Sequence, residues 1–333
     1  MASPDVNPPQ LDCLSSFSSL QNSFDLLFYK SCQDFKISIE INIIIRKIIR
    51  MKSTFLCLLL IFFTFANSFA GENILRISTI PDESPTELIR KFKPLTKYLS
   101  KEIGLDVKFT PLTNYAATVE ALSAGKVDLV WYGGFTHVQA RIRTQGKAIP
   151  LVMRKRDLEF RSKFIKNINS KIQGLRDLKQ KTFAFGSVSS TSGHLMPRFF
   201  LKKVGLKPEI DFYKFSFSGA HDATAKWVEA GKVDAGALNE AVWEKLVKSR
   251  KVDLKKVKVF YTTPPYVDYN WTVRKGLGRD ILSKITSAFL KLNRNNPEHN
   301  EILKLQRAEK YIIAFVSDFD AIRTAAKEAG LLK

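Results

Sequence analysis

Alternating and helical patterns of apolar positions divide the chain after residue 73 into strands and helices. Residues 74–80 alternate apolar and polar side chains as a half-buried strand does, and Pro81 ends the run. Between residues 86 and 103 the apolar positions recur at helical spacing, and Gly104 closes the helix. After Arg274 the pattern is helical to the C-terminus. The same reasoning predicts strands at 107–110, 127–131, 182–185, 212–217 and 233–238, and helices at 115–124, 194–204 and 221–230.

The order of these elements predicts the fold class. Strands that alternate with helices of this length indicate α/β layers with a largely parallel sheet. A similar phrase occurs at 121–128 and at 228–234, where a helix ends at Gly and a strand begins at Val-Asp. This repetition indicates two similar α/β lobes, although a helix followed by Gly, Lys and a strand is also common in unrelated proteins.

Residues 51–70 have the pattern of a cleaved signal peptide. A Met-Lys start precedes an apolar run at 55–66, and a small-x-small sequence ends at Ala70. The run is shorter than the roughly 20 apolar residues that a membrane-spanning helix needs. We therefore expect cleavage after Ala70 and release of the protein into the periplasm.

Residues 1–50 precede this complete signal peptide and need a separate explanation. The simplest is that they are a mis-started or non-native extension and that translation begins at Met51. The alternative is an added membrane anchor at 41–49, whose apolar run is interrupted by Asn42, Arg46 and Lys47.

Charge and cysteine content narrow the function classes. The chain has 53 Lys and Arg against 32 Asp and Glu, a formal net charge of +21. This excess is spread along the chain with no basic arm and no zinc-finger spacing, so we expect a surface that attracts anions and no nucleic-acid partner. All three cysteines lie before residue 71, which leaves no thiol after the signal peptide for a disulfide framework or a thiolate metal site.

The strongest candidate site is the loop Gly-Ser-Val-Ser-Ser-Thr-Ser-Gly at 186–193, between a predicted strand and a predicted helix. Hydroxyl groups and free backbone amides at a helix N-terminus form a site for anions. The alternative is that the cluster only caps the helix, for which a single hydroxyl is enough. We therefore predict that Ser190, Thr191 and Ser192 bind an anion.

Other candidate residues lie where predicted strands end or helices begin. His221 and Asp222 begin a helix, although a lone histidine is often structural and Asp222 also suits the helix dipole without any ligand. Ligands of open α/β sheets bind at the carboxyl ends of strands. Aromatic, hydroxyl and carboxylate groups at or near such positions add further candidates, several of which could equally pack in the hinge: Tyr115, Tyr132, Thr136, Tyr266 and Asp268.

Motifs for catalysis and for cofactors are missing from the sequence. It has no Gly-x-Ser-x-Gly elbow, no His-Glu-x-x-His and no Gly-x-x-x-x-Gly-Lys-Ser/Thr loop. With only four histidines in the chain, no multi-histidine metal site is expected. We therefore expect a protein that is not an enzyme and that carries no cofactor and no metal.

Several of these segments together resemble the phosphate, phosphite and phosphonate class of periplasmic binding proteins of ABC importers. The resemblance rests on Asn-Tyr at 114–115, Val-Asp-Leu-Val-Trp-Tyr-Gly at 127–133, Ser-Thr-Ser-Gly at 190–193 and Gly-Ala-His-Asp at 219–222. Within that class the chain is most similar to members labelled as selenate-binding proteins, judged from 189–197, 218–222 and 261–266.

This resemblance implies a type II binding-protein fold, in which two α/β lobes joined by two crossing strands close on an anion. By analogy the first lobe is 74–160 plus 270–333 and the second is 161–269. The resemblance further implies a monomer that delivers its anion to a membrane permease. By position, it places Tyr115, Tyr132, Ser190, Thr191, Ser192 and His221 at the anion. The segment at 262–270 departs from the family pattern, which leaves the role of Asp268 open.

The identity of the anion depends on whether a carboxylate reaches it. Phosphonates, phosphite and phosphate keep a proton that an ionised Asp222 or Asp268 can accept, whereas selenate has none and would be repelled. A phosphonate-like or phosphite-like ligand is the favoured prediction, and selenate is the alternative. A periplasmic sensor or a cofactor-using transferase on the same fold are alternatives of other function classes.

Overall fold

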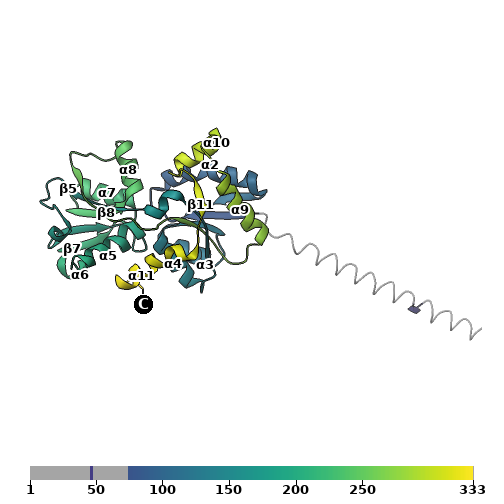
Figure 1. Ribbon diagram of the computed structural model, residues 1–333, viewed down its shortest axis with the longest axis horizontal. Coiled ribbons are helices and arrows are strands. Elements are labelled where there is room, and N and C mark those ends of the chain that lie inside the picture. Colours follow the sequence, from purple (N-terminus) through teal and green to yellow (C-terminus); the bar gives the residue numbers. More distant parts are fainter. Residues whose placement is uncertain (1–45, 48–73, 333) are drawn as a thin grey trace, which may run out of the picture. The chain divides into compact units, whose positions relative to one another are not determined.

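The computed structural model describes residues 46–47 and 74–332, and the latter range forms two α/β lobes (Figure 1). The predicted extension at 1–50 and the predicted signal peptide at 51–70 lie outside the described residues, apart from Arg46 and Lys47. In the described ranges, no helix has both the length and the apolar character that a membrane span requires.

A six-stranded mixed sheet forms the centre of the first lobe. β1 pairs in parallel with β2 and β3, whereas β10 and β11 run antiparallel to their neighbours. The strands are, in spatial order, β11 (Tyr311–Ile313), β4 (Ile149–Arg154), β10 (Asn270–Val273), β3 (Leu129–Tyr132), β1 (Ile74–Thr79) and β2 (Asp106–Phe109). Its helices are α2 (Pro85–Ile103), α3 (Tyr115–Ser123), α4 (Gly134–Arg143), α9 (Arg279–Lys291), α10 (Pro297–Leu305) and α11 (Asp320–Glu328).

A five-stranded mixed sheet forms the centre of the second lobe. β6 pairs in parallel with β7 and β8, and β5 runs antiparallel to both of its neighbours. The spatial order is β7 (Lys214–Phe217), β6 (Thr182–Phe185), β8 (Ala235–Asn239), β5 (Ser162–Asn167) and β9 (Val257–Thr262). Its α-helices are α5 (Met196–Lys203), α6 (Pro208–Asp211), α7 (His221–Glu229) and α8 (Glu240–Lys248), which Figure 1 shows on the side of the molecule opposite α2 and α9.

The sequence motif that the two lobes share, a helix followed by Gly and a strand, has the same local structure at both positions. Gly125 and Gly231 both end their helices with a positive φ, at 70° and 68°, which a glycine adopts without steric cost. The aspartate that follows each one accepts a hydrogen bond from a neighbouring strand: Asp128 from the Arg76 amide at 2.7 Å, and Asp234 from the Thr182 amide at 2.8 Å. The two lobes therefore share this local structure as well as the phrase.

Two crossing segments connect the lobes, one at 155–161 between β4 and β5 and one at 263–269 between β9 and β10. Phe160 and Tyr266 pair across them in antiparallel fashion, with N–O distances of 2.8 and 2.9 Å. The Asp268 amide also donates to the Asp157 carbonyl at 2.9 Å. These bonds hold the two segments beside each other and thereby fix the backbone near Asp268.

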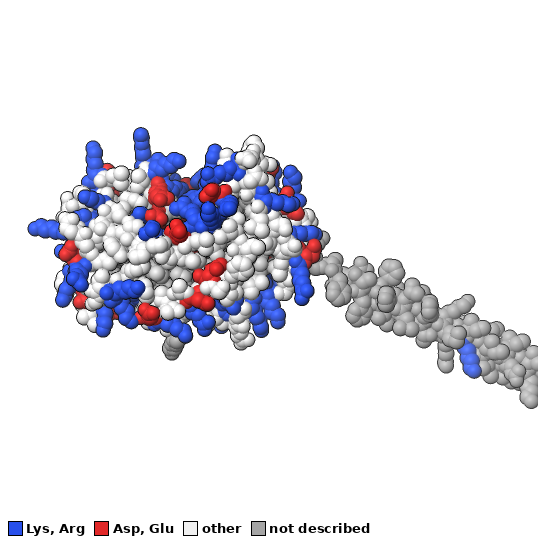
Figure 2. Space-filling view, in the orientation of Figure 1, with Lys and Arg blue, Asp and Glu red and all other residues white. Residues whose placement is uncertain are grey.

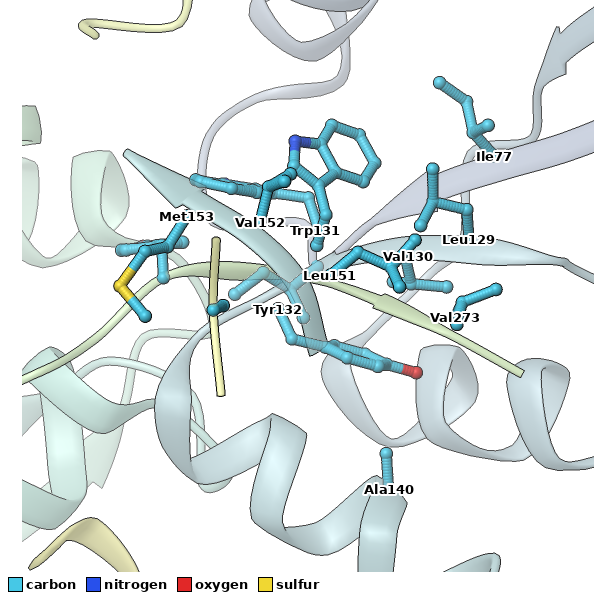
Figure 3. Packing of buried hydrophobic residues seen from close by; sticks show 14 of the residues in the cluster. Ile77, Leu129, Val130, Trp131, Tyr132, Ala140, Leu151, Val152, Met153 and Val273 are labelled. Atoms are coloured by element: carbon cyan, nitrogen blue, oxygen red, sulfur yellow. The ribbon is translucent and has the colours of Figure 1, made fainter. Parts of the chain in front are cut away.

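Aromatic side chains fill the core of the first lobe. Figure 3 shows Trp131 and Tyr132 pointing to opposite faces of the sheet, as successive residues of a strand must. Trp131 lies beside Trp271 and stacks on Tyr269, with ring centroids 5.4 and 5.3 Å apart. The buried Arg154 guanidinium lies 4.9 Å from the Trp131 ring.

Three predictions about secondary structure need correction. The sheets are mixed and not largely parallel, since four strand pairings within the described residues are parallel and five are antiparallel. The alternation of strands and helices in the sequence does not show that β5, β10 and β11 run against their neighbours. The C-terminal region is not helical throughout, because β11 pairs with β4 at the edge of the sheet. Three residues are too few to show a strand's alternation, so only the tertiary pairing reveals this element. The helix expected from 194 begins earlier, with the π-helical turn η3 (Thr191–Leu195), which leads into α5.

Candidate functional site

Buried polar side chains from both lobes meet where the lobes touch. Seven of them are almost wholly inaccessible to solvent: Asp82, Tyr115, Ser190, Thr191, Ser192, His221 and Asp268. Burying a polar group costs free energy unless it is hydrogen bonded. Within residues 74–332, four atoms of this set have no hydrogen-bond partner, namely Asp82 Oδ1, Tyr115 Oη, His221 Nε2 and Asp268 Oδ2. A polar ligand at this position would complete their hydrogen bonding.

The serine-rich and threonine-rich loop reaches this junction at a helix N-terminus, as the sequence predicts. Ser190 caps η3 by accepting a hydrogen bond from the Gly193 amide at 3.0 Å. The cap uses only this one hydroxyl. Capping alone therefore does not account for the buried hydroxyls of Thr191 and Ser192, and these can contact an anion together with the free amides of the first turn.

His221 lies against the same loop as a neutral hydrogen-bond donor. A side chain at Gly193 would place its Cβ 3.0 Å from His221 Cε1, so only glycine allows this packing. Burial lowers the pKa of His221 to about 4, against the opposing effect of Asp82, and the ring is therefore neutral at pH 7. Its Nδ1 accepts a hydrogen bond from the Asn239 amide at 3.3 Å, which places the ring hydrogen on Nε2. This N–H is one of the donors without a partner.

Two hydrogen bonds join the loop directly to the first lobe. Thr191 Oγ1 accepts a hydrogen bond from the Phe135 amide, and Thr136 Oγ1 donates one to the Ser189 carbonyl, both at 2.9 Å. Gly133 lies between the lobes, since a Cβ there would be 2.9 Å from Thr191 Oγ1. Thr191 and Thr136 therefore hold the lobes together at the candidate site.

Asp268 brings a carboxyl group with a strongly shifted pKa to the junction. One oxygen, Oδ1, accepts a hydrogen bond from the Gly134 amide at 2.9 Å, whereas Oδ2 has no partner within the described residues. Burial raises the pKa of Asp268 to about 7, although the Gly134 amide and the Thr191 hydroxyl oppose the shift. This carboxyl can thus either donate or accept a hydrogen bond near neutral pH.

Tyr115 and Asp82 complete the group from the first lobe. Tyr115 is the first residue of α3, whose N-cap Asn114 accepts a hydrogen bond from the Ala117 amide at 2.9 Å. Burial raises the pKa of Tyr115 well above its ordinary value, and the charge of Asp82 adds to the shift. The phenol therefore keeps its hydrogen and can donate it. Asp82 Oδ2 accepts a hydrogen bond from the Tyr269 hydroxyl at 2.9 Å.

Besides Thr136, whose hydroxyl donates to the Ser189 carbonyl, three predicted site residues make other contacts in the structure. The Tyr132 hydroxyl donates to the Thr118 carbonyl at 2.7 Å, in the core that Figure 3 shows. Both oxygens of Asp222 are engaged, one by the amide of Ala223 at 2.9 Å and one by the Ser84 amide at 3.1 Å. The Tyr266 hydroxyl lies 2.6 Å from Ser162 Oγ. These three side chains do not join the group of atoms without partners.

Asp82 is a candidate site residue that the sequence analysis missed. It lies just beyond β1, and its carbonyl accepts a hydrogen bond from the His221 amide of the second lobe at 3.1 Å. The rule that ligands bind beyond the carboxyl ends of strands singled out the end of β3, and the same rule applied to β1 would have found Asp82.

Sequence and structure comparisons relate the chain to transport proteins. Residues 77–319 match the family model described as the periplasmic substrate-binding protein of phosphonate ABC transporters. The probable ABC transporter phosphite binding protein PhnD1 of Prochlorococcus marinus is 36% identical over 288 residues, which are 82% of this chain and 96% of that protein. The phosphonates-binding periplasmic protein of Escherichia coli is 28% identical over 72% of each chain.

The structural comparison agrees with these sequence matches. The structure of PhnD1 from Prochlorococcus marinus in complex with methylphosphonate has a TM-score of 0.75 and 36% identity. The similarity covers 79% of this chain and all of that one.

Proposed function

The chain belongs to the family of periplasmic substrate-binding proteins of phosphonate ABC transporters, and from this premise we propose that it captures a small phosphorus oxyanion between its lobes. The ligand is a phosphonate or phosphite, and the protein delivers it to a permease in the cytoplasmic membrane. Export through a signal peptide at 51–70 and a monomeric state belong to the same proposal.

One observation carries the choice of ligand site: buried polar atoms of both lobes have no partner within the described residues. Tyr115 and His221 Nε2 supply hydrogens, and the Ser190–Ser192 segment supplies hydroxyls and amides at a helix N-terminus. These groups suit the several oxygens of a tetrahedral anion. The methylphosphonate bound to the related PhnD1 supports the same ligand class.

Asp268 favours an anion that shares a proton with the protein. At neutral pH one proton is held either by this carboxyl or by a phosphonate or phosphite oxygen, and in both cases one hydrogen bond forms. Selenate brings no proton, so it requires Asp268 in its protonated form. With a pKa of about 7, this form becomes scarce as the pH rises above neutral, which makes selenate the weaker candidate.

A thermal-shift panel on the purified protein tests the proposal. A ligand at a hundredfold excess over its Kd stabilises the folded state by about 2.7 kcal/mol. We expect shifts with methylphosphonate and phosphite and smaller shifts with phosphate, sulfate, selenate and selenite. No shift with any of these anions would overturn the proposed ligand class.

The protein is proposed to bind its ligand without transforming it. Incubation with methylphosphonate, followed by phosphorus NMR of the recovered ligand, should return the same compound. Release of inorganic phosphate at a rate proportional to protein concentration would instead support an enzyme on this fold.

A further inference from the structure

An ion-pair network joins the two lobes beside the candidate site. Lys245, in α8 of the second lobe, donates to Glu83 and Glu87 of the first lobe, with an Nζ–Oε distance of 2.6 Å to each. Lys251, also of the second lobe, bonds Glu87 at 3.0 Å. Figure 2 shows acidic and basic side chains gathered in the hollow where the lobes meet. We call Lys245, Glu83 and Glu87 the interlobe clasp.

Glu83 is held as an anion by residues of its own lobe. Its side chain is 3% exposed, and it pairs with Arg307 and with Lys91, the latter at 3.9 Å. Burial acts to raise the pKa of Glu83, but Arg307, Lys91 and Lys245 together hold the pKa well below its usual range. Because Arg307 and Lys91 lie in the first lobe, Glu83 remains charged when Lys245 withdraws.

Lys245 has a different position in the network. Within the described residues, both of its ion pairs cross to the other lobe, so separation of the lobes breaks both at once. Glu87 keeps one partner in its own helix, Arg90, at 3.0 Å. The hydrogen bond from Lys245 is the main reason that the pKa of Glu87 falls to about 2, against the effect of its partial burial. The clasp therefore stabilises the arrangement with the lobes together and no other.

The clasp is one peptide bond from the candidate site. Glu83 directly follows Asp82, whose carbonyl accepts the His221 amide from the second lobe at 3.1 Å. Neither Glu83 nor Lys245 belongs to the group of buried atoms without partners at the site. The charge of Glu83 does act on the pKa of His221, but Arg307 and Lys91 keep that charge in place when Lys245 is lost. Loss of Lys245 therefore acts on ligand capture chiefly through the position of the lobes.

We propose that Lys245 is a positioning residue for ligand capture, which acts by clasping Glu83 and Glu87 when the lobes close. This inference rests on the proposed function. The measured Kd of a ligand is its intrinsic Kd divided by the fraction of protein in the binding-competent state. Loss of the clasp lowers that fraction, so it weakens every ligand by the same factor and leaves the order of preference unchanged.

The first experiment compares Lys245→Met with Lys248→Met. Lys248 ends the same helix and has no ion pair within residues 74–332, so it is a matched control for the loss of one positive charge. Calorimetric titration measures the Kd of methylphosphonate and of phosphite. Lys245→Met should raise both Kd values by the same factor, roughly 5- to 150-fold, which is the usual range of a coupling between two sites. An unchanged Kd, or an equal loss in Lys248→Met, overturns the proposal.

A double-mutant cycle separates the clasp from a general effect of charge. Glu87→Gln should weaken binding by itself, and it should add less in the Lys245→Met background, because only its pair with Lys251 then remains to be lost. Strictly additive effects of the two substitutions would contradict the clasp. Circular dichroism checks that each variant is folded.

A measurement without ligand tests the clasp even if the proposed ligands do not bind. The chain has no cysteine after residue 70, so spin labels at Lys97→Cys and Lys179→Cys report one distance between the lobes. Double electron–electron resonance should show a larger fraction of short distances between the two labels in the parent protein than in Lys245→Met. Lys248→Met should give the same distribution as the parent. Equal distributions in all three proteins contradict the proposal. Failure of the wild-type protein to bind any anion counts against the proposed function alone.

Discussion

The Thr191 hydroxyl, in the second lobe, accepts a hydrogen bond from the backbone amide of Phe135, in the first lobe, at 2.9 Å. The same hydroxyl lowers the pKa of Asp268 and so lies beside that carboxyl. One side chain of the predicted anion loop therefore also holds the lobes together. The proposed ligand site and the contact between the lobes therefore share the same few atoms.

Gly133→Ala should weaken ligand binding without unfolding the protein. The added Cβ would lie 2.9 Å from Thr191 Oγ1 and 3.1 Å from Asp268 Oδ1, so these two side chains must move from their positions at the junction. The backbone of Gly133, with φ −75° and ψ 161°, suits alanine. Gly278→Ala is the matched control, since Gly278 also precedes a helix and its Cβ would meet no atom within 4 Å. Equal affinities of the two variants for methylphosphonate would refute the prediction.

Thr191→Val should abolish most of the affinity, and Thr191→Ser should retain it. Valine preserves the shape but leaves the Phe135 amide and the ligand without the hydroxyl, a loss of about 1–3 kcal/mol, or roughly 5- to 150-fold in Kd. Calorimetric titration with methylphosphonate measures the difference. A valine variant that binds as well as the serine variant would show that the hydroxyl does not contact the anion.

Asp268→Asn should change how anion preference depends on pH. The pKa of Asp268 is about 7, so in the wild type the protonated form needed for sulfate or selenate disappears above neutral pH, and their affinity falls up to about tenfold per pH unit. The asparagine variant should bind these two anions with no such fall between pH 7 and 9. A parallel decline in both proteins would exclude Asp268 as the source.

His221→Phe should lose ligand binding, whereas His299→Phe should keep it. Phenylalanine fills the space of the ring but removes the Nε2 hydrogen, a donor without a partner within the described residues. His299 lies on α10 of the first lobe, where its ring contacts Tyr98. Thermal shifts with phosphite compare the two.

Since burial lowers the pKa of His221 to about 4, protonation of this residue should not alter wild-type binding between pH 6 and 8.

The free energy of unfolding should fall in acid because three histidines are buried. Burial lowers the pKa of His137 to about 3, and that of His194 and of His221 to about 4, below the value of about 6.5 in an unfolded chain. The unfolded state therefore binds more protons between pH 6.5 and 4, and stability falls as the pH drops through this window. Burial raises the pKa of three aspartates, and these oppose the trend: Asp157, Asp222 and Asp268. Urea denaturation at pH 7 and pH 5 measures the difference, and equal stabilities would contradict the prediction.

Local sequence patterns were enough to predict much of this protein. Neighbouring residues alone show the alternation in β1, the helical spacing in α2 and the glycines that end helices. The order of these elements in turn indicates the α/β fold class. The anion loop at 186–193 was also predictable, because its hydroxyls and its helix N-terminus are adjacent in the chain. The family resemblance rested on the same short motifs, and the match over residues 77–319 confirms it.

Only the tertiary structure decided which side chains share the junction. Tyr132 and Asp268 were equally good candidates in the sequence, yet the pleat of β3 turns Tyr132 into the core while the paired crossing segments bring Asp268 to the site. Asp82 reaches His221 across 139 residues of chain, and Glu83 reaches Lys245 across 162. Such contacts depend on how the sheets of the two lobes are placed in space. The spacing of residues along the sequence does not predict that placement. The raised pKa of Asp268 is likewise a tertiary property, since it follows from the burial of this carboxyl.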